Sequence, residues 1–373
     1  MPDTSEFRKT TRTVDAVSPR SSKLSTLDST KDVLKVVYDV YESQWTATDS
    51  SLVNFVFLHG SGMNRKVWDD YVDKLNLPAN KRGWRIGKVV LIDQVNHGDS
   101  AVLNEPLLGT IYDWSDGARD VCKICADEFY NGSRKNGTFN VVVGHSMGGF
   151  QALCCSVLFP GIFDTVLCIE PVVWMKRVRN AGNDDITIMS PTFYKALAAT
   201  MQDEFSSQQH FDRYFDKSSL YAASDPVIKK RERQFELQKL TENVFRTKTN
   251  ARQHMLTYLT LNPTATWLMK SLPFINCPVA CIYGSKSKWC PPENRHYLRN
   301  HIKGYQEVEV DGGHLINIES PASVIGNINT SLSKLLPKET EKSGLDADAR
   351  QSKFDSDYKT LLKERVMKGT PKL

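Results

Sequence analysis

The sequence lacks long apolar runs, a strong charge imbalance and an apolar start. No stretch of 18 apolar residues occurs, which argues against a transmembrane helix. The chain opens on Met1-Pro2-Asp3-Thr4, so we expect no secretory signal peptide. The 48 basic and 43 acidic residues give a net charge of +5 over 373 residues, and the two signs are interleaved, as in the segment 229–233. This balance is typical of solvated surfaces, and we expect no nucleic-acid partner.

The eight cysteines also lack a metal-binding pattern. Cys122 and Cys125 have the spacing of half a zinc or redox site, but no second pair follows at metal spacing. Most of the others fall in expected strands and helices, where a free cysteine behaves as a small apolar residue. We therefore expect free thiols, no metal and no cofactor.

Short apolar runs alternate with helical patterns over most of the chain. The expected strands are 35–41, 53–58, 89–92, 140–143, 165–169, 278–283 and 306–310, and helical patterns such as 67–75 and 116–129 fall between them. Nearly continuous apolar strands with intervening helices indicate a mostly parallel sheet covered on both faces. We predict an α/β fold with its site at the carboxyl ends of the strands.

Composition predicts further divisions of the chain. Residues 1–32 are rich in Ser, Thr and Lys, and we expect a flexible arm there. Residues 33–173 and 272–336 form the predicted core. The segment 174–271 between them is far longer than a single crossover helix requires, which predicts a helical cap inserted after the sixth strand. Residues 337–373 are polar and charged, and we expect a flexible tail.

The predicted cap contains amphipathic runs such as 192–205 and 225–238. Its aromatic and methionine side chains are candidates either for an acyl pocket or for the small core of the cap itself. These residues are Trp174, Met175, Phe193, Tyr194, Met201, Phe211, Tyr214, Phe215, Met255, Tyr258 and Trp267.

A nucleophile motif follows the apolar run 140–143. The segment Gly144-His145-Ser146-Met147-Gly148 is G-x-S-x-G between an expected strand and an expected helix, the setting of a serine on a sharp, strained turn. The glycines matter because the positions two before and two after the serine must lack bulk. The motif predicts Ser146 as a catalytic nucleophile, and the alternative is an ordinary glycine-rich turn.

A serine hydroxyl is a weak nucleophile until a base takes its proton. His314 follows a short strand and a diglycine turn near the end of the predicted core. Serine before histidine is the chain order of α/β-hydrolases, so His314 is the predicted base. His59 and His97 precede the nucleophile, and we expect them to brace loops.

The usual position of the triad acid is empty. The turn after the expected strand 278–283 reads Gly284-Ser285-Lys286-Ser287-Lys288-Trp289-Cys290 and has no carboxylate. The strand 165–169 ends in Glu170, and a carboxylate there can reach the same histidine, since a triad is defined by geometry. We predict Glu170 as the acid. Asp311, a serine–histidine dyad and a purely structural role of Glu170 stay open as alternatives.

An oxyanion hole needs two N–H donors. Met147, the residue after the nucleophile, supplies the first. The second is expected from the loop after strand 53–58, His59-Gly60-Ser61-Gly62-Met63, whose glycines let the backbone approach a substrate closely. We predict Met147 and Ser61 as the donors.

The chain ends in Pro371-Lys372-Leu373. Ser-Lys-Leu at a free carboxyl end is the peroxisomal import address, and this tripeptide keeps two of its three positions. We expect a peroxisomal import receptor to read it and the protein to reside in the peroxisomal matrix. The cytoplasm is the alternative location.

Several longer strings resemble a known family. They are the segments 59–63, 91–101, 116–121, 144–153, 169–173 and 289–292. Together they resemble the fungal peroxisomal lipases, a group of α/β-hydrolases, over about residues 35–335 and most densely outside the cap. The resemblance implies esterase and triacylglycerol lipase activity, with phospholipase activity as an option, and it carries over Ser146 as nucleophile and His314 as base.

The leading prediction is therefore a serine hydrolase that cleaves carboxylic esters of lipids through an acyl-enzyme. An acyl-CoA thioesterase or a carbon–carbon hydrolase with the same triad is the alternative. A catalytically inactive hydrolase fold that serves as a binding module is less favoured, because both Ser146 and His314 are present.

Overall fold

The computed structural model describes residues 7–44, 51–76, 84–130, 138–173, 176–180, 183–187, 191–260, 264–335 and 347–367. Residues 1–336 form one compact unit, and residues 337–373 form a second.

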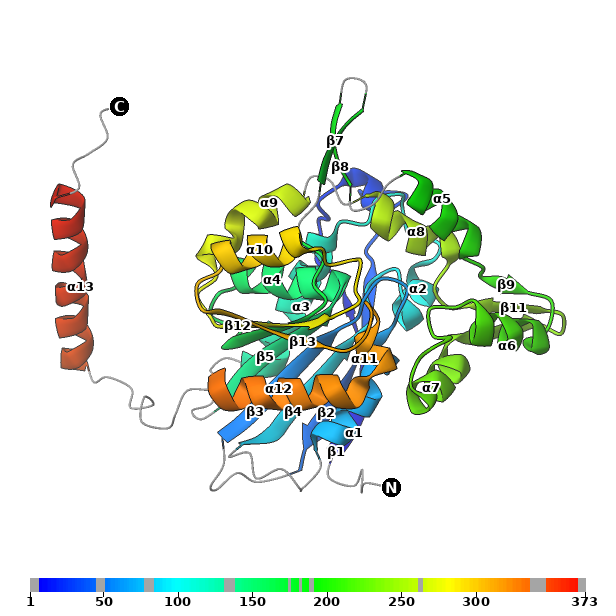
Figure 1. The fold of residues 1–373 in the computed structure, drawn as a ribbon, viewed down its shortest axis with the longest axis horizontal. Coiled ribbons are helices and arrows are strands. Elements are labelled where there is room, and N and C mark those ends of the chain that lie inside the picture. Colours follow the sequence, from blue (N-terminus) through cyan, green and yellow to red (C-terminus); the bar gives the residue numbers. More distant parts are fainter. Residues whose placement is uncertain are drawn as a thin grey trace. The chain divides into compact units, whose positions relative to one another are not determined.

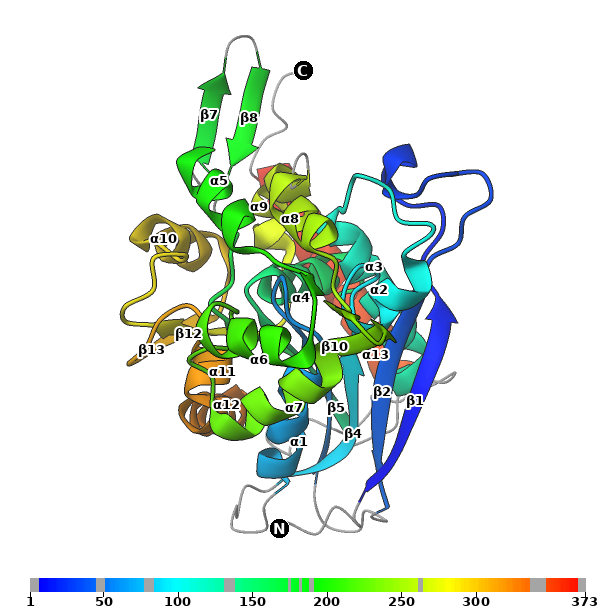
Figure 2. The ribbon, with the colours of Figure 1, turned by 90° about the vertical axis from the view of Figure 1, so that its right-hand side faces the viewer.

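An eight-stranded sheet is the centre of the first unit (Figures 1 and 2). Its strands, in spatial order, are β1 (Phe7–Asp15), β2 (Lys35–Ser43), β4 (Trp84–Ile92), β3 (Ser51–Leu58), β5 (Thr138–His145), β6 (Thr165–Ile169), β12 (Val279–Gly284) and β13 (Tyr305–Val310). From β4 to β13 all neighbours are parallel, whereas β1 pairs with β2 and β2 with β4 in antiparallel register. The predicted α/β fold with a mostly parallel sheet is confirmed.

Alternation along β3 shows how the sheet separates two apolar cores. Phe55 and Phe57 belong to one cluster of buried side chains, and Val56 and Leu58 to the other, because successive side chains of a strand point to opposite faces. The first core contains side chains of α1 (Asp69–Leu75) and α12 (Pro321–Leu335). The second contains those of α3 (Trp114–Cys125) and α4 (Met147–Leu158), so helices cover both faces (Figure 1).

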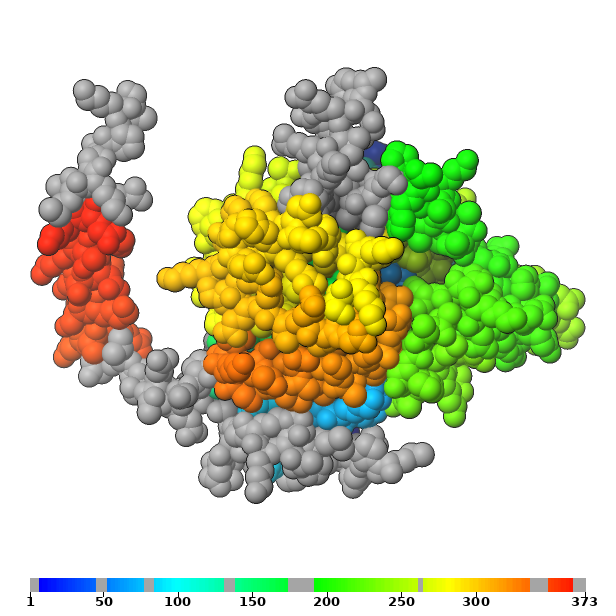
Figure 3. Space-filling model, in the orientation of Figure 1, coloured from blue at the N-terminus to red at the C-terminus, as the bar shows by residue number. Residues whose placement is uncertain are grey.

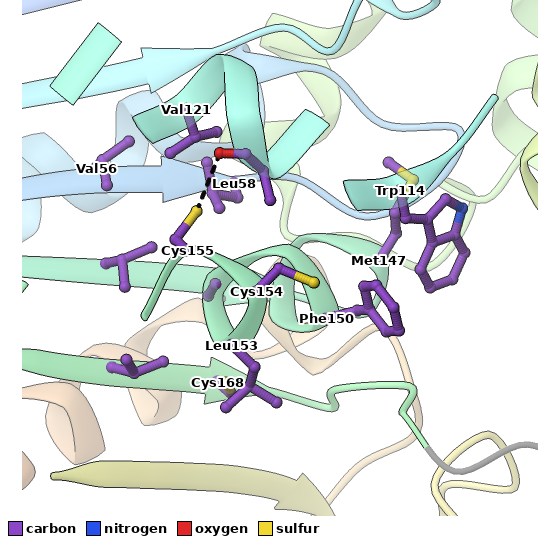
Figure 4. Close-up of a cluster of buried hydrophobic side chains, with 14 of the residues drawn as sticks. Val56, Leu58, Trp114, Val121, Met147, Phe150, Leu153, Cys154, Cys155 and Cys168 are labelled. Atoms are coloured by element: carbon purple, nitrogen blue, oxygen red, sulfur yellow. Dashed lines mark hydrogen bonds between the residues drawn. The ribbon is translucent and has the colours of Figure 1, made fainter. Parts of the chain in front are cut away.

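Helix α4 carries buried side chains into the second core, among them Phe150, Leu153, Cys154 and Cys155 (Figure 4). The Cys155 thiol donates a hydrogen bond of 3.5 Å to the carbonyl of Ala118 on α3. All eight cysteines of the chain are free thiols, and seven of them are buried. The expectation of free, packed cysteines is confirmed.

The insertion between β6 and β12, residues 174–271, is called the cap segment here. Its helices are α5 (Pro191–Thr200), α6 (Gln208–Lys217), α7 (Pro226–Glu236), α8 (Ala251–Leu259) and α9 (Thr264–Ser271). It also has a hairpin of β7 (Lys176–Asn180) and β8 (Asn183–Thr187) and an antiparallel sheet of β9 (Glu204–Phe205), β10 (Leu237–Thr241) and β11 (Val244–Thr247).

A helical cap is therefore an incomplete description of this segment. The run expected to be helical over 192–205 stops at Thr200, because Glu204 and Phe205 pair with β11 instead. At the far end, α9 buries Ala265 and Leu268 in the core that contains α3 and α4. By its contacts α9 belongs to the core rather than to a separate cap.

Two members of the predicted aromatic set pack into the interior, while most of the other described members are partly buried. Phe211 and Phe215 of α6 are buried and continuous with the sheet core that contains α1 and α12. Figure 3 shows this part of the cap segment (green) beside α11 (Ile316–Glu319) and α12 (orange). Trp174 and Met175 lie outside the described residues.

The prediction of a flexible arm over residues 1–32 is wrong for its described part. Strand β1 pairs with β2 along its whole length, with Phe7 opposite Ser43 and Asp15 opposite Lys35. Arg20 then forms an ion pair of 2.8 Å with Asp120 of α3. A half-exposed edge strand needs few large apolar residues, and its threonines favour extended backbone, so the composition resembles that of a loose chain.

The predicted flexible tail contains a helix, α13 (Ala347–Met367). Its Phe354, Tyr358, Leu361 and Leu362 side chains are exposed. The targeting tripeptide Pro371-Lys372-Leu373 lies outside the described residues. Within the ranges that the structure describes, no helix has both the length and the apolarity needed to span a bilayer.

Candidate active site

Ser146 occupies the sharp turn between β5 and α4 with a backbone φ of 54°. A side chain at Gly144 would place its Cβ 2.0 Å from the carbonyl oxygen of Gly148. A side chain at Gly148 would place its Cβ 2.2 Å from the carbonyl oxygen of Leu58 on β3. Both glycines are therefore required by close backbone packing, which holds the Ser146 hydroxyl at the carboxyl end of the sheet.

Three side chains predicted to act together lie in hydrogen-bond contact. His314 Nε2 is 2.9 Å from Ser146 Oγ, and His314 Nδ1 is 2.9 Å from Glu170 Oε2. Ser146 directly follows β5, Glu170 directly follows the neighbouring β6, and His314 follows β13. Glu170 is fully buried, while the His314 side chain is 9% exposed. The arrangement has the geometry of a nucleophile, a base and an orienting carboxylate.

The Glu170 carboxylate is held from the turn that follows β12. The Gly284 N–H donates to Oε1 at 2.7 Å, and the Ser287 hydroxyl donates a short hydrogen bond to Oε2. Sequence reasoning noted that this turn has no carboxylate but missed that its serine binds the carboxylate of the adjacent strand. The signal for this contact was the Ser287 hydroxyl, which lies in the turn where the acid of this fold is usually found.

The alternative acid is placed elsewhere. Asp311 forms an ion pair of 2.7 Å with Lys286, and its side chain is 80% exposed. The Lys286 ammonium lowers the pKa of Asp311. Asp311 therefore interacts with solvent and lysine, while the imidazole of His314 contacts Glu170.

Two aromatic rings fix the position of the His314 imidazole. The Trp289 indole stacks on it with ring centroids 5.0 Å apart and an interplanar angle of 17°. The His145 Nε2–H donates to the His314 carbonyl at 2.8 Å. Burial lowers the pKa of His145 well below its usual value, so this ring is neutral at physiological pH. Sequence reasoning assigned neither residue to the site.

The loop after β3 packs directly against the nucleophile turn. A Cβ on Gly60 would lie 2.5 Å from His145 Nδ1 and 3.3 Å from the Cβ of Ser146. In the same loop the Gly62 N–H donates to His97 Nε2 at 2.9 Å, and the Met63 N–H donates to the Gly60 carbonyl at 3.1 Å. These bonds engage two of the loop's amides, and the Ser61 N–H stays the predicted second oxyanion donor.

Met147 is the first residue of α4, where helix geometry leaves N–H groups without an intrahelical acceptor. Its amide and that of Ser61 thus come from two backbone segments that meet at Ser146. The Ser61 hydroxyl itself makes a short contact with the hydroxyl of Thr257 on α8, which links the loop to the cap segment.

His59 and His97 lie within the loops and not beside the nucleophile hydroxyl. His59 accepts from the Gln94 N–H at 3.1 Å through Nε2 and donates to the Gly60 carbonyl at 2.9 Å through Nδ1. Burial lowers the pKa of His59 to about 4 and that of His97 well below its usual value. Both rings are neutral braces, the role expected from their place in the chain.

Aromatic side chains of the cap segment reach the site through Trp289. Phe193 of α5 meets the indole edge-on at a centroid distance of 5.3 Å, and the Tyr258 ring of α8 lies 5.9 Å from it. A cavity of about 120 Å³ lies between Gly62, in the loop after β3, and the cap segment. Its lining includes Leu197, Met201, Phe215 and Leu220.

One group of side chains in the described ranges also has the spacing of a metal site. Glu170, Cys290 and His314 each offer a ligand atom, and these atoms lie within 4.8 Å of one another. This group shares Glu170 and His314 with the hydrogen-bonded set that includes Ser146.

A sequence model of the alpha/beta hydrolase family matches residues 55–326. Peroxisomal membrane protein LPX1 of Saccharomyces cerevisiae is 36% identical over 381 residues, which cover 98% of this chain and 98% of that protein. The solved structure of the peroxisomal alpha-beta-hydrolase Lpx1 from the same yeast has a TM-score of 0.84 at 35% identity, covering 96% of this chain and 98% of that one. The resemblance to a fungal peroxisomal α/β-hydrolase is confirmed.

More distant matches are shorter or share only the fold. A type I acyl-CoA thioesterase of Penicillium brevicompactum is 26% identical over 144 residues, or 38% of this chain and 32% of that protein. An esterase of Mycobacterium tuberculosis has a TM-score of 0.56 at 16% identity, covering 80% of this chain and 87% of that one.

Proposed function

Because the chain belongs to the alpha/beta hydrolase family, we propose that it is a serine hydrolase that cleaves carboxylic esters of lipids through an acyl-enzyme. One observation carries the proposal. His314 lies 2.9 Å from the Ser146 hydroxyl on one side and 2.9 Å from the buried Glu170 carboxylate on the other. This is the arrangement that activates a serine for attack on a carbonyl.

In the proposed first step, Ser146 Oγ attacks the ester carbonyl while His314 Nε2 takes the hydroxyl proton. The Met147 and Ser61 amides stabilise the oxyanion that develops. Glu170 keeps the Nδ1 proton of His314 pointing away from the serine and stabilises the imidazolium. When the tetrahedral intermediate collapses, His314 gives its proton to the leaving alkoxide, and the acyl group stays on Ser146.

In the second step, a water molecule replaces the alcohol. His314 takes a proton from the water, which attacks the acyl-enzyme carbonyl, and the same oxyanion donors stabilise the second tetrahedral intermediate. The carboxylic acid leaves, and Ser146 recovers its proton from His314. The aromatic side chains Phe193, Trp289 and Tyr258 beside the triad favour an apolar acyl group.

A fluorophosphonate probe tests the nucleophile. The wild-type protein should label stoichiometrically, and Ser146→Ala should remove both labelling and ester hydrolysis, with a loss in rate on the order of 10⁴ to 10⁶. Ser156→Ala is a matched control, because Ser156 is also a buried serine but lies within α4 and donates to the Leu153 carbonyl. Labelling that persisted at another serine of the Ser146→Ala protein would contradict the assignment.

The second candidate function is acyl-CoA thioester hydrolysis, which the match to a Penicillium thioesterase favours. The same triad performs either reaction, so the leaving group decides between them. Purified protein tested on short aryl esters, long triacylglycerols and acyl-CoA distinguishes the two by the ratio of kcat/KM values. A phospholipid in the same panel tests phospholipase activity.

We also propose that the protein acts in the peroxisomal matrix. The yeast relative carries "peroxisomal" in its name, and this chain ends in Pro371-Lys372-Leu373. The basic side chain and the terminal leucine of such a tripeptide are the features that the import receptor reads.

A further inference from the structure

Cys290 is a buried thiol that the proposed hydrolysis does not use. It is 2% exposed and lies just before α10 (Pro292–His301). Its Sγ donates to the Pro171 carbonyl at 3.3 Å. It belongs to the group with Glu170 and His314 in which a thiol, a carboxylate oxygen and an imidazole nitrogen lie within 4.8 Å of one another.

We propose that these three side chains form an inhibitory site for a thiophilic divalent cation of the Zn²⁺ type. Thiolate, imidazole and carboxylate are the three ligand types that Zn²⁺ binds in proteins. Ligand bonds of about 2.0 to 2.3 Å place the donor atoms of one tetrahedral ion about 3 to 4 Å apart. Donors already within 4.8 Å reach that spacing through small side-chain movements, with water in the fourth position.

The surroundings of Glu170 support such a site. The Gly284 amide and the Ser287 hydroxyl already bind its carboxylate, and such hydrogen bonds orient metal ligands. Trp289 stacked on His314 fixes the plane of the imidazole. Two of the three ligands are therefore held in place before an ion arrives, and Cys290 supplies the soft donor that selects Zn²⁺ over Mg²⁺ or Ca²⁺.

The ion has a route to the site that does not cross the cap segment. An open groove of about 680 Å³ has both Ser287 and Cys290 in its wall, and all of its lining residues lie between 285 and 309. Glu293 and His296 also line this groove and provide weaker ligands along the way, whereas Glu309 in its wall is paired with Arg295 at 2.6 Å. The cation thus reaches Cys290 from the side of α10.

Binding would stop the proposed hydrolysis, and in this respect the inference rests on the proposed function. The thiol loses one proton to solvent when its sulfur binds the ion. The imidazole of His314 binds through Nδ1, so its single proton moves to Nε2. Nε2 then donates toward Ser146 and no longer accepts its proton, and the base is lost. No electron is transferred in any of these steps.

Binding of Co²⁺ alone tests the site without any substrate. Cobalt adopts zinc sites and shows a thiolate-to-metal charge-transfer absorption when a cysteine binds it. We expect this band in the wild-type protein and in Ser146→Ala, which lacks the nucleophile but keeps all three ligands. Cys290→Ser should abolish it. His314→Ala, in which the thiol is intact, should weaken Co²⁺ binding at least about tenfold.

The matched control is Cys277→Ser, since Cys277 is the half-buried cysteine and lies outside the group. It should leave the band unchanged. A band that persists in Cys290→Ser, or is absent from the wild type, overturns the proposal, as does equal binding by His314→Ala. Should Cys290→Ser fail to fold, His314→Ala and Cys277→Ser still decide the question.

Inhibition by Zn²⁺ is measured separately, on each protein relative to its own rate without the ion. We expect the concentration for half-inhibition to rise at least about tenfold in Cys290→Ser, and a chelator to restore wild-type activity. Wild-type protein that shows the Co²⁺ band but hydrolyses no ester would contradict the proposed function and not the metal site. Wild-type protein that hydrolyses esters but shows no Co²⁺ band would contradict the metal site and not the proposed function.

Discussion

At the scale of single residues, the site depends on which strand supplies the carboxylate. Glu170 directly follows β6, and its oxygens accept from the Gly284 amide, the Ser287 hydroxyl and His314 Nδ1. A fully buried carboxylate is costly unless hydrogen bonds compensate for its lost hydration. These three donors provide that compensation, and only one of them, His314, connects to the nucleophile.

The role of Glu170 can be tested by comparing it with Asp311. Glu170→Gln keeps the size of the side chain but removes the acceptor that fixes the His314 tautomer. We expect kcat to fall by about 10⁴, as in other triads that lose the acid. Asp311→Asn should retain wild-type kcat, because Asp311 pairs with Lys286 in solvent. Steady-state kinetics on an aryl ester measure both, and a near-wild-type Glu170→Gln enzyme would indicate a dyad.

Sequence reasoning reached the three central residues because each carries a local signature. Ser146 lies in its motif, His314 follows a diglycine turn, and Glu170 interrupts an apolar strand at its end. The structure brings these side chains together, while their roles stay predictions. Trp289 and Cys290 could not be predicted in the same way, because only the packing of their loop against β6 and His314 brings them to the site.

At the scale of elements, α7 is attached by two carboxyl groups to the residue that follows the loop 59–63. Asn64 follows the loop directly, and its Nδ2 donates to Glu232 at 2.5 Å and to Glu236 at 2.6 Å. The two glutamates lie one turn apart on α7 and are both buried. Burial raises the pKa of Glu236 to about 7 and that of Glu232 well above its usual value.

This contact predicts a pH dependence of stability. A carboxyl whose pKa is raised on folding binds its proton more tightly in the folded than in the unfolded state. The contribution of Glu236 to the free energy of unfolding is therefore fully present below pH 4.5. It is lost as the pH rises through about 7. One pKa unit is worth about 1.4 kcal/mol, so a shift from 4.5 to about 7 amounts to at most about 3.5 kcal/mol.

Glu236→Gln imitates the protonated carboxyl and should flatten this pH dependence. Urea unfolding between pH 5 and pH 8 measures the free energy of unfolding at each pH, and the difference between wild type and variant isolates the contribution of Glu236. Glu242→Gln is the control, because Glu242 is an exposed residue of the turn between β10 and β11. Parallel curves for wild type and Glu236→Gln would show that Glu236 is ionised throughout.

The strands that could be predicted well from the sequence are those buried on both faces of the sheet. Strand β6 was predicted to the residue, over Thr165–Ile169, because all five residues are apolar or buried within the sheet. Strand β1 was missed because an edge strand alternates half-exposed polar residues and takes its stability from pairing with β2. The short strands β9 to β11 were missed for a related reason. They are defined by pairing with one another within the cap segment and not by a local pattern of apolar residues.

At the scale of the whole molecule, the groups of the candidate site all belong to the unit formed by residues 1–336. The second unit contains α13 and ends in the tripeptide Pro371-Lys372-Leu373. The two tasks proposed for the chain, hydrolysis and import, are thus assigned to separate units.

Removing Leu373 alone should separate these tasks. The receptor reads the basic side chain together with the terminal leucine and its carboxylate, so the shortened chain should stay in the cytosol. Its kcat/KM on esters should equal that of the full chain. Fluorescence microscopy of a protein tagged at its N-terminus, with a peroxisomal marker, gives the location. Peroxisomal import of the shortened chain would indicate another signal or import with a partner.

The backbone at Ser146 and Glu170 has a consequence for the engineering of this chain. These two residues are the non-glycine positions with positive φ in the described ranges, at 54° and 51°, and each directly follows a central strand. Such conformations cost on the order of 1 to 3 kcal/mol each, which glycine would largely recover. A search for more stable variants therefore favours glycine at the proposed nucleophile and at the proposed acid. Stability and the proposed chemistry make opposite demands on these two positions.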